Sequence, residues 1–156
     1  MAYQKLQAGR ALAVINSNSI NIPDVGGPTV TSTMSQAPPS NVTLVDNTQD
    51  FTAMTGLVGS TVIVNGTAIS RVESVTNATS IVLEDAILTT SQDYVIYFED
   101  TNGCVLYAGS GGNIRVLTTG NDDVTFVGVA PGAFIPVQVK RVFASGTGPS
   151  DIVALW

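Results

Sequence analysis

Apolar and polar residues alternate with a period of two along the last third of the chain, the pattern typical of β-strands. The alternation covers residues 113–116, 123–126 and 135–140, and glycine, asparagine and proline separate these runs. Short alternating runs with such breaks predict an antiparallel sheet. The chain closes with a run of apolar residues, 152–156, that ends on Trp156. A free strand of this kind would aggregate, so we expect it to be paired inside a sheet or buried in an assembly.

Three features of this segment predict local departures from a regular ladder. Pro136 has no backbone N–H, so its strand is expected at a sheet edge or at a bulge. Lys140 and Arg141 interrupt the alternation, which predicts a bulge at this pair. The sequence 130–132, Ala-Pro-Gly, predicts a turn in which glycine takes the positive φ.

Residues 41–99 are predicted to form a small β unit of their own, a barrel or a sandwich. Four- and five-residue β-forming runs follow one another there, and Asn65-Gly66 is the strongest hairpin signal in the chain. A helical period never persists, so helix is expected only as a turn or two near 50–55 or 85–88.

The remaining segments suggest how the chain is organised. Residues 1–22 are predicted to hold an N-terminal arm and a first strand at 11–15, and residues 23–40, rich in Pro, Gly, Ser and Thr, a linker or arm. The first strand has no local partner, so we expect it to pair with strands of 100–156. The predicted fold is all-β: an antiparallel sandwich or jelly-roll-like domain of the N-terminal strand and residues 100–156, with 41–99 inserted as a small barrel-like unit.

The two ends of the chain also carry a resemblance. The segments GNIRVLT, DVTFVGV, FIPVQVKRV and DIVALW, with the opening MAYQKLQAGRALAVI, resemble virion proteins of tailed bacteriophages. They are similar to head spike-base and decoration proteins of such phages, marine cyanophages among them, and of gene transfer agents. The resemblance implies a capsid decoration, cement or spike-base protein on the outside of the head, assembled in the cytoplasm of a bacterial host. Its implied partners are the major capsid protein, further copies in a trimer or pentamer, and a head fibre protein.

Composition narrows the classes of function. Charged residues make up 12% of the chain and hydrophobic residues 44%, whereas about a quarter of the residues in a typical soluble domain are charged. A protein so poor in charge is expected to cover much of its surface with partners, although a secreted domain coated with Ser and Thr is an alternative. The net charge of −6 gives no electrostatic footprint for nucleic acid. No apolar run long enough for a membrane span and no signal peptide is recognisable.

The chain offers little for catalysis or metal binding. It has no histidine and one cysteine, Cys104, which is expected to be a small buried hydrophobe. Pairs of aspartates at 46/50 and 122/123 could touch a calcium ion, but aspartate is an ordinary turn residue and no spaced calcium loop is present. We therefore expect neither an enzyme, nor a cofactor, nor a metal site.

The candidate contact residues come from the N-terminal arm and the C-terminal strands. They are Tyr3, Leu6, Arg10, Lys140, Arg141 and Trp156. Arg and Trp are frequent interface anchors; alternatively, Trp156 belongs to the core and the two basic residues are solvated. A second hypothesis makes the protein a tail, baseplate or fibre component that binds a host glycan, and it predicts an exposed aromatic platform at residues 94–98. A secreted adhesin-like domain is a third hypothesis.

Overall fold

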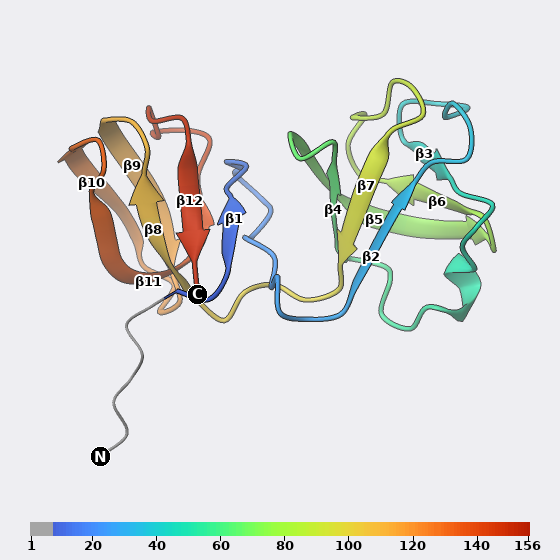
Figure 1. Cartoon of the computed structure of the whole chain (residues 1–156), viewed down its shortest axis with the longest axis horizontal. Coiled ribbons are helices and arrows are strands. Elements are labelled where there is room, and N and C mark those ends of the chain that lie inside the picture. The colour runs from blue at the N-terminus through green and yellow to red at the C-terminus, as the bar shows by residue number, and fades with distance from the viewer. Residues whose placement is uncertain (1–7) are drawn as a thin grey trace, which may run out of the picture. The chain divides into compact units, whose positions relative to one another are not determined.

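The computed structural model describes residues 8–156, and its chain divides into two compact units. Unit 1 joins the N-terminal segment up to Val25 with Thr101–Trp156, and unit 2 comprises Gly26–Asp100. The described residues form twelve strands and one short 3-10 helix, so the predicted all-β fold is confirmed. Each unit contains one six-stranded antiparallel sheet (Figure 1).

The sheet of unit 1 has the strand order β1-β12-β8-β11-β9-β10. Its strands are β1 (Ala11–Ala13), β8 (Cys104–Ala108), β9 (Gly112–Thr118), β10 (Asp123–Val129), β11 (Phe134–Val142) and β12 (Ile152–Leu155). The first strand pairs with the last, with Leu12 opposite Ala154, as the missing local partner had predicted. The terminal apolar run is thus enclosed in the sheet between β1 and β8.

Alternate residues of these strands form the core of unit 1. Those with the least exposure are Cys104, Leu106, Ala108, Ile114, Val116, Val139, Val142 and Ala154. Partly buried residues, among them Leu12, Phe126, Val129, Val137 and Trp156, pack against this cluster. The period of two in the sequence therefore marks the core face correctly for β9 and β11.

Strand β11 is irregular at two places. Its register shifts between Ile135 and Val139 where it pairs with β8, and between Val139 and Arg141 where it pairs with β9. The bulge predicted at the basic pair is confirmed. Pro136 was predicted to lie at a sheet edge or at a bulge. The edge position is wrong, because β11 lies between β8 and β9. The bulge is confirmed, because the proline falls inside the first register shift.

Hydrogen bonds at Thr101 connect the segment where the chain leaves unit 1 to the segment where it returns. Its backbone N–H donates to the carbonyl of Ile22 over 2.9 Å. The indole N–H of Trp156 donates to the Thr101 hydroxyl over 2.8 Å. One buried residue, Thr101, thereby links the N-terminal segment to the end of the chain.

Unit 2 has the strand order β2-β7-β4-β5-β6-β3. Its elements are β2 (Thr29–Thr33), β3 (Thr43–Val45), the 3-10 helix η1 (Phe51–Ala53), β4 (Thr61–Val64), β5 (Ala68–Asn77), β6 (Ser80–Leu83) and β7 (Asp93–Tyr97). The long strand β5 pairs with β4 through its first part and with β6 through the rest, and the pairing with β6 contains two register shifts. Figure 1 shows the consequence: β4 and β7 stand upright, whereas β5 and β6 run across.

Turn chemistry in unit 2 largely follows the prediction. Asn65 and Gly66 both have a positive φ, and the N–H of Thr67 donates to the carbonyl of Val64, which closes the β4–β5 hairpin. The carboxylate of Asp50 accepts from two backbone N–H groups and caps η1. The second expected turn of helix, near 85–88, is not formed.

Residues 23–40 were expected to be a linker, and this is wrong. Strand β2 lies within them and pairs with β7 from Thr29 to Thr33, so unit 2 begins at Gly26 and not at residue 41. Val30 packs on the core of unit 2 and Met34 is buried in it. The threonines that alternate with Val30 are β-branched and favour a strand, a signal that the Pro- and Gly-rich flanks obscured.

Leu106 is completely buried at the centre of the unit 1 core. We expect Leu106→Ala to lower the free energy of unfolding by about 2–5 kcal/mol, because the lost side chain leaves a cavity. Urea denaturation measures this. Val127→Ala is the control, since Val127 is 78% exposed, and equal losses in the two variants would contradict the assigned core face.

Candidate interaction surface on the unit 1 sheet

Strands β8 and β12 are apolar at every position, which an antiparallel sheet with one face in water does not require. Leu106 and Ala108 in β8, and Ile152 and Ala154 in β12, belong to the core. Successive side chains on a strand point to opposite faces. The intervening apolar residues of both strands therefore lie on the second face of the sheet.

The strand register aligns these residues in two rows. One row runs from Ala13 through Val153 and Tyr107 to Phe134 across four neighbouring strands. The other runs from Ala11 through Leu155 to Val105 across three of them. We call these seven residues the outer apolar face; the strands that carry them are neighbours in the sheet (Figure 1).

The outer apolar face is open at its aromatic end. Phe134 is 60% exposed and its ring lies 5.4 Å from that of Tyr107, at an angle of 58°. The two alanines are exposed, and Val105, Tyr107, Val153 and Leu155 are half-buried. No member is charged, and the Tyr107 hydroxyl is the one hydrogen-bonding side-chain group in the set.

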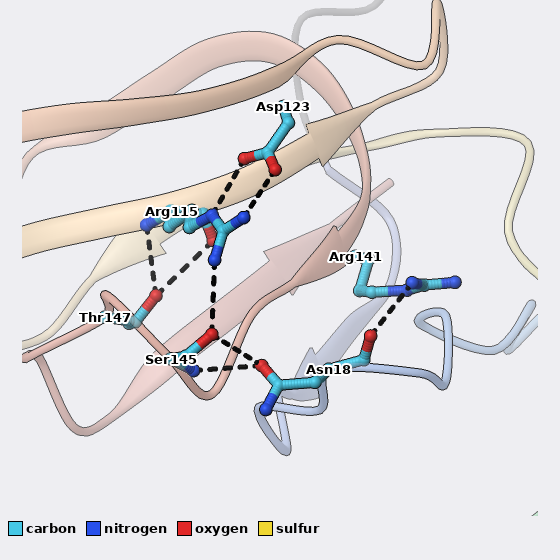
Figure 2. Close-up of polar contacts among 6 residues, drawn as sticks. All are labelled: Asn18, Arg115, Asp123, Arg141, Ser145 and Thr147. Carbon is cyan, nitrogen blue, oxygen red and sulfur yellow. Dashed lines mark hydrogen bonds and ion pairs between the residues drawn. The ribbon is translucent and has the colours of Figure 1, made fainter.

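The outer face changes character on β9 and β10, where Arg115 organises a polar cluster. Its guanidinium donates to both carboxylate oxygens of Asp123, over 2.8 Å from Nε and 2.6 Å from Nη2 (Figure 2). This hydrogen-bonded pairing lowers the pKa of Asp123 and raises the pKa of Arg115. The fork geometry is the strongest form of carboxylate pairing, so the charge on edge strand β10 is neutralised within the sheet.

The same guanidinium reaches the loop that follows β11. Its Nη1 donates to the hydroxyl of Ser145 over 3.2 Å, and both the N–H and the hydroxyl of Ser145 donate to Oδ1 of Asn18, each over 3.0 Å. The backbone N–H of Arg115 also donates to the hydroxyl of Thr147. Figure 2 shows that Asn18 comes from the N-terminal segment, so the cluster fastens that segment to the C-terminal loop.

Arg141 completes the cluster. It donates from Nη1 to the carbonyl of Asn18 over 3.1 Å and from Nε to Oδ1 of Asn21 over 2.9 Å. Arg115 and Arg141 lie 4.4 Å and 5.8 Å from the centre of the Phe143 ring, within cation–π distance. The polar contacts of these arginines in the described chain hold unit 1 together.

The predicted contact residues are distributed as follows. Tyr3 and Leu6 lie outside the described residues. Arg10 is exposed and exchanges backbone hydrogen bonds with Trp156. Lys140 donates to the side-chain oxygen of Asn121. Arg141 belongs to the polar cluster.

Trp156 packs on the core, which agrees with the alternative interpretation of this residue. The structure brings Arg10 and Trp156 together but does not unite the predicted set in one surface. The outer apolar face was missed, and its signal is the unbroken apolar sequence of β8 and β12.

Unit 2 contains a buried carboxylate, Asp46, where the sequence predicted only a turn residue. Its oxygens accept from the hydroxyl of Tyr94 over 2.7 Å, from the N–H and hydroxyl of Thr48, and from the hydroxyl of Ser35. Burial alone would raise the pKa of Asp46, but hydrogen bonding to Ser32, Thr48 and Tyr94 outweighs it and holds the pKa well below its usual range. Burial and the neighbouring carboxylate raise the pKa of Tyr94.

The aromatic platform that the glycan hypothesis predicts at 94–98 is not formed. Tyr94 is 1% exposed and belongs to the core of unit 2. Phe98 packs against the same core, and Tyr97 is half-buried. Tyr94 and Phe98 therefore stabilise unit 2 from within, and Tyr97 alone does not make a platform.

Cys104 is the small buried hydrophobe that the sequence predicted. It is 1% exposed, and its thiol donates to the carbonyl of Val139 over 3.2 Å. Burial raises the pKa of the thiol to about 12, which keeps it protonated and unreactive at neutral pH.

Among residues 8–156, no group of three or more His, Cys, Asp or Glu side chains is placed to hold a metal ion. The same part of the chain has no helix of the length and hydrophobicity needed to cross a membrane. Comparison with protein-family models, with curated proteins and with solved structures gives no match.

Asp46 is expected to make the free energy of unfolding depend on pH in the acidic range. Its pKa in the folded chain lies below the ordinary value of 3.8, so ionised Asp46 stabilises the fold above that pH and the contribution is lost as the pH falls further. We expect the unfolding free energy of Asp46→Asn to be lower at neutral pH and to fall less steeply below pH 3.8. The control variant is Glu73→Gln, which removes an exposed carboxylate and should lower the unfolding free energy at neutral pH less than Asp46→Asn does.

Asn18 is expected to restrain the loop after β11. In Asn18→Ala the hydrogen bonds from Ser145 are lost, so the Ser145 amide should exchange with deuterium faster, while the amide of the buried Val116 should not change. Hydrogen exchange resolved by residue measures both amides. Unchanged exchange at Ser145 would contradict the role of Asn18 as the link.

Proposed function

We propose that the protein is a non-enzymatic structural component of a tailed-phage virion. Its role is that of a capsid decoration, cement or head spike-base protein that binds the major capsid protein on the outside of the head. The observation that carries this proposal is the outer apolar face, an uncharged patch on the second side of a sheet whose first side already packs into a core.

Burial of the outer apolar face favours association. Covering apolar surface contributes about 25 cal/mol per Å², and large side chains such as Phe134 and Tyr107 contribute most. The low charge of the chain, 12% of its residues, fits a subunit that shares much of its surface with neighbours. Apolar surface and low charge together support a role as a subunit of a larger assembly.

The phage resemblance supports the same role. The segments that carry it contain β1 and β9 to β12, all of them strands of unit 1, which also bears the outer apolar face. Unit 2 interrupts this set as an insertion. We therefore assign attachment to the particle to unit 1.

The rival role, a tail or fibre component that binds a host glycan, has less support. It needs an exposed aromatic platform at residues 94–98, and Tyr94 is buried with its hydroxyl on Asp46. No other feature of the described residues specifically favours a glycan.

Binding to phage heads stripped of their minor proteins tests the proposal. The purified full-length protein should co-sediment with the heads, and Phe134→Lys should weaken binding by about tenfold or more, because a charge would replace an anchor at the contact. Val58→Lys is the matched control, since Val58 is 59% exposed but lies in unit 2.

Two results would contradict the proposal. One is a parent protein that does not co-sediment with the heads. The other is equal binding by the Phe134 and Val58 variants, which would remove the outer apolar face from the contact.

A further inference from the structure

Unit 2 is far more acidic than the rest of the chain. Residues 26–100 carry eight acidic side chains and one basic side chain, a net charge of −7, whereas unit 1 carries four acidic and five basic side chains, a net charge of +1. The carboxylates of unit 2 that are exposed to solvent belong to Asp50, Glu73, Glu84, Asp85, Asp93 and Glu99. The surface of unit 2 is therefore negative and attracts positively charged partners.

One loop of unit 2, residues 54–59, presents an apolar side chain to solvent. Leu57 is buried in the core, and Val58 beside it is 59% exposed. The glycines that flank this pair, Gly56 and Gly59, have φ angles of 78° and 86°, a conformation that glycine adopts without strain. Of the large exposed apolar side chains in the described chain, Val58 is the one that belongs to unit 2.

Hydrogen bonds hold this loop in place. The Ser60 hydroxyl donates to the carbonyl of Gly56 over 2.9 Å, and the Ser60 N–H donates to the carbonyl of Leu57 over 3.1 Å. Nη1 of Arg71 donates to the carbonyl of Gly59 over 3.0 Å. Because a fixed loop loses little conformational entropy when a partner binds, Val58 is an exposed apolar group on a preorganised support.

A mainly apolar hollow of about 390 Å³ lies beside the loop. Met54 and Phe98, which also pack against the core of unit 2, line it together with the exposed Pro28. Two further hollows, of about 250 and 400 Å³, share Gly56 with it and are both lined by Val58. We call Pro28, Met54, Val58 and Phe98 the unit 2 apolar patch.

The charge at the edge of this patch is negative. Glu99 lines the same hollow as Met54 and Phe98 and is exposed to solvent. Arg71, the single base of unit 2, lies in the neighbouring hollow but is paired with the Asp100 carboxylate over 3.4 Å. A partner that fills the hollow therefore meets the carboxylate of Glu99 at its rim.

We infer that unit 2 binds a cationic protein segment at the unit 2 apolar patch, with an aliphatic side chain in the hollow and a Lys or Arg side chain beside Glu99. An acidic segment would be repelled by the net charge of −7, and an uncharged segment would gain nothing from it. The inference goes beyond the proposed function, which assigns attachment to unit 1 and gives unit 2 no partner.

The patch is small, which sets the strength of binding. Its four residues are far fewer than the roughly 20–30 that a standard interface contributes from each side. A short segment should therefore bind weakly and reversibly. Added salt should weaken the binding further, because it screens the attraction between exposed charges.

An NMR titration of the isotope-labelled full-length protein tests the inference. The probe is a synthetic peptide with the sequence Gly-Lys-Leu-Lys-Gly-Lys-Leu-Lys-Gly. The backbone amide signals of residues 54–59 and 98–99 should shift and saturate as peptide is added. The amide of Asn65, which follows the far end of β4, should not shift.

Two matched peptides separate apolar contact from charge. A peptide with Ser in place of Leu keeps the charge, and one with Glu in place of Lys keeps the leucines; neither should give saturable shifts at the patch. Equal shifts with the serine peptide would mean that unit 2 attracts cations without using the hollow. Equal shifts with the glutamate peptide would mean that charge plays no part. Either result, or no shift with the lysine peptide, overturns the inference.

Two charge-reversal variants locate the contact. Glu99→Lys should weaken binding of the lysine peptide about fivefold or more, because it turns an attraction at the rim into a repulsion. Asp93→Lys is the control, since it changes the net charge equally at the end of β7 away from Phe98, and its affinity should stay close to that of the parent. Equal losses in both variants would reduce the effect to net charge and overturn the inference.

The two proposals fail separately. Glu99 lies in unit 2 and the outer apolar face lies in unit 1, so Glu99→Lys should co-sediment with phage heads as the parent does. A protein that binds the lysine peptide but not heads would contradict the proposed function alone. One that binds heads but not the peptide would overturn this inference alone.

Discussion

The pairing of β12 with β1 on one side and β8 on the other is the interaction on which unit 1 depends. It joins the two ends of the chain in one sheet and encloses the most apolar strand of the molecule. Because the N-terminal strand finds its partner only at the C-terminus, everything between the crossings can be an independent insertion, and unit 2 is one. The Thr101 hydroxyl, held by the Trp156 indole, closes the unit where the chain crosses.

The same pairing explains why the sheet has two contrasting halves on its outer face. β12 and β8 are enclosed strands without polar side chains except Tyr107, so the face they present is apolar. β9 and β10 approach the open edge, and there the arginine fork on Asp123 and the link to Asn18 use polar groups to hold loops in place. Edge strand β10 has a bulge between Phe126 and Val129 and a charged pair near its start, both of which discourage strand addition.

Unit 2 is stabilised by different means. Its core packs around Tyr94, Phe51 and Leu57, and its one deeply buried carboxylate, Asp46, is ionised because four donors surround it. A carboxylate can stay ionised in the interior when its oxygens accept enough hydrogen bonds. Removing one of these donors would lower the free energy of unfolding. The Tyr94 hydroxyl on Asp46 thereby joins β7 to the residue that follows β3.

Periodicity, turn residues and composition determine much of this fold from the sequence alone. They predicted the all-β class, the core faces of β9 and β11, the hairpin at Asn65-Gly66, the bulge at Lys140-Arg141 and the pairing of the two ends, because each depends on local backbone preference or on the need to bury an apolar stripe. What only the tertiary structure decided depends on residues far apart in the chain. Tyr94 meets Asp46 across 48 positions, β2 becomes a strand because β7 offers it a partner, and Pro136 lies inside the sheet because a bulge accommodates it. The outer apolar face exists only through register, since Ala13, Val153, Tyr107 and Phe134 become one row when four strands from both ends of the chain align.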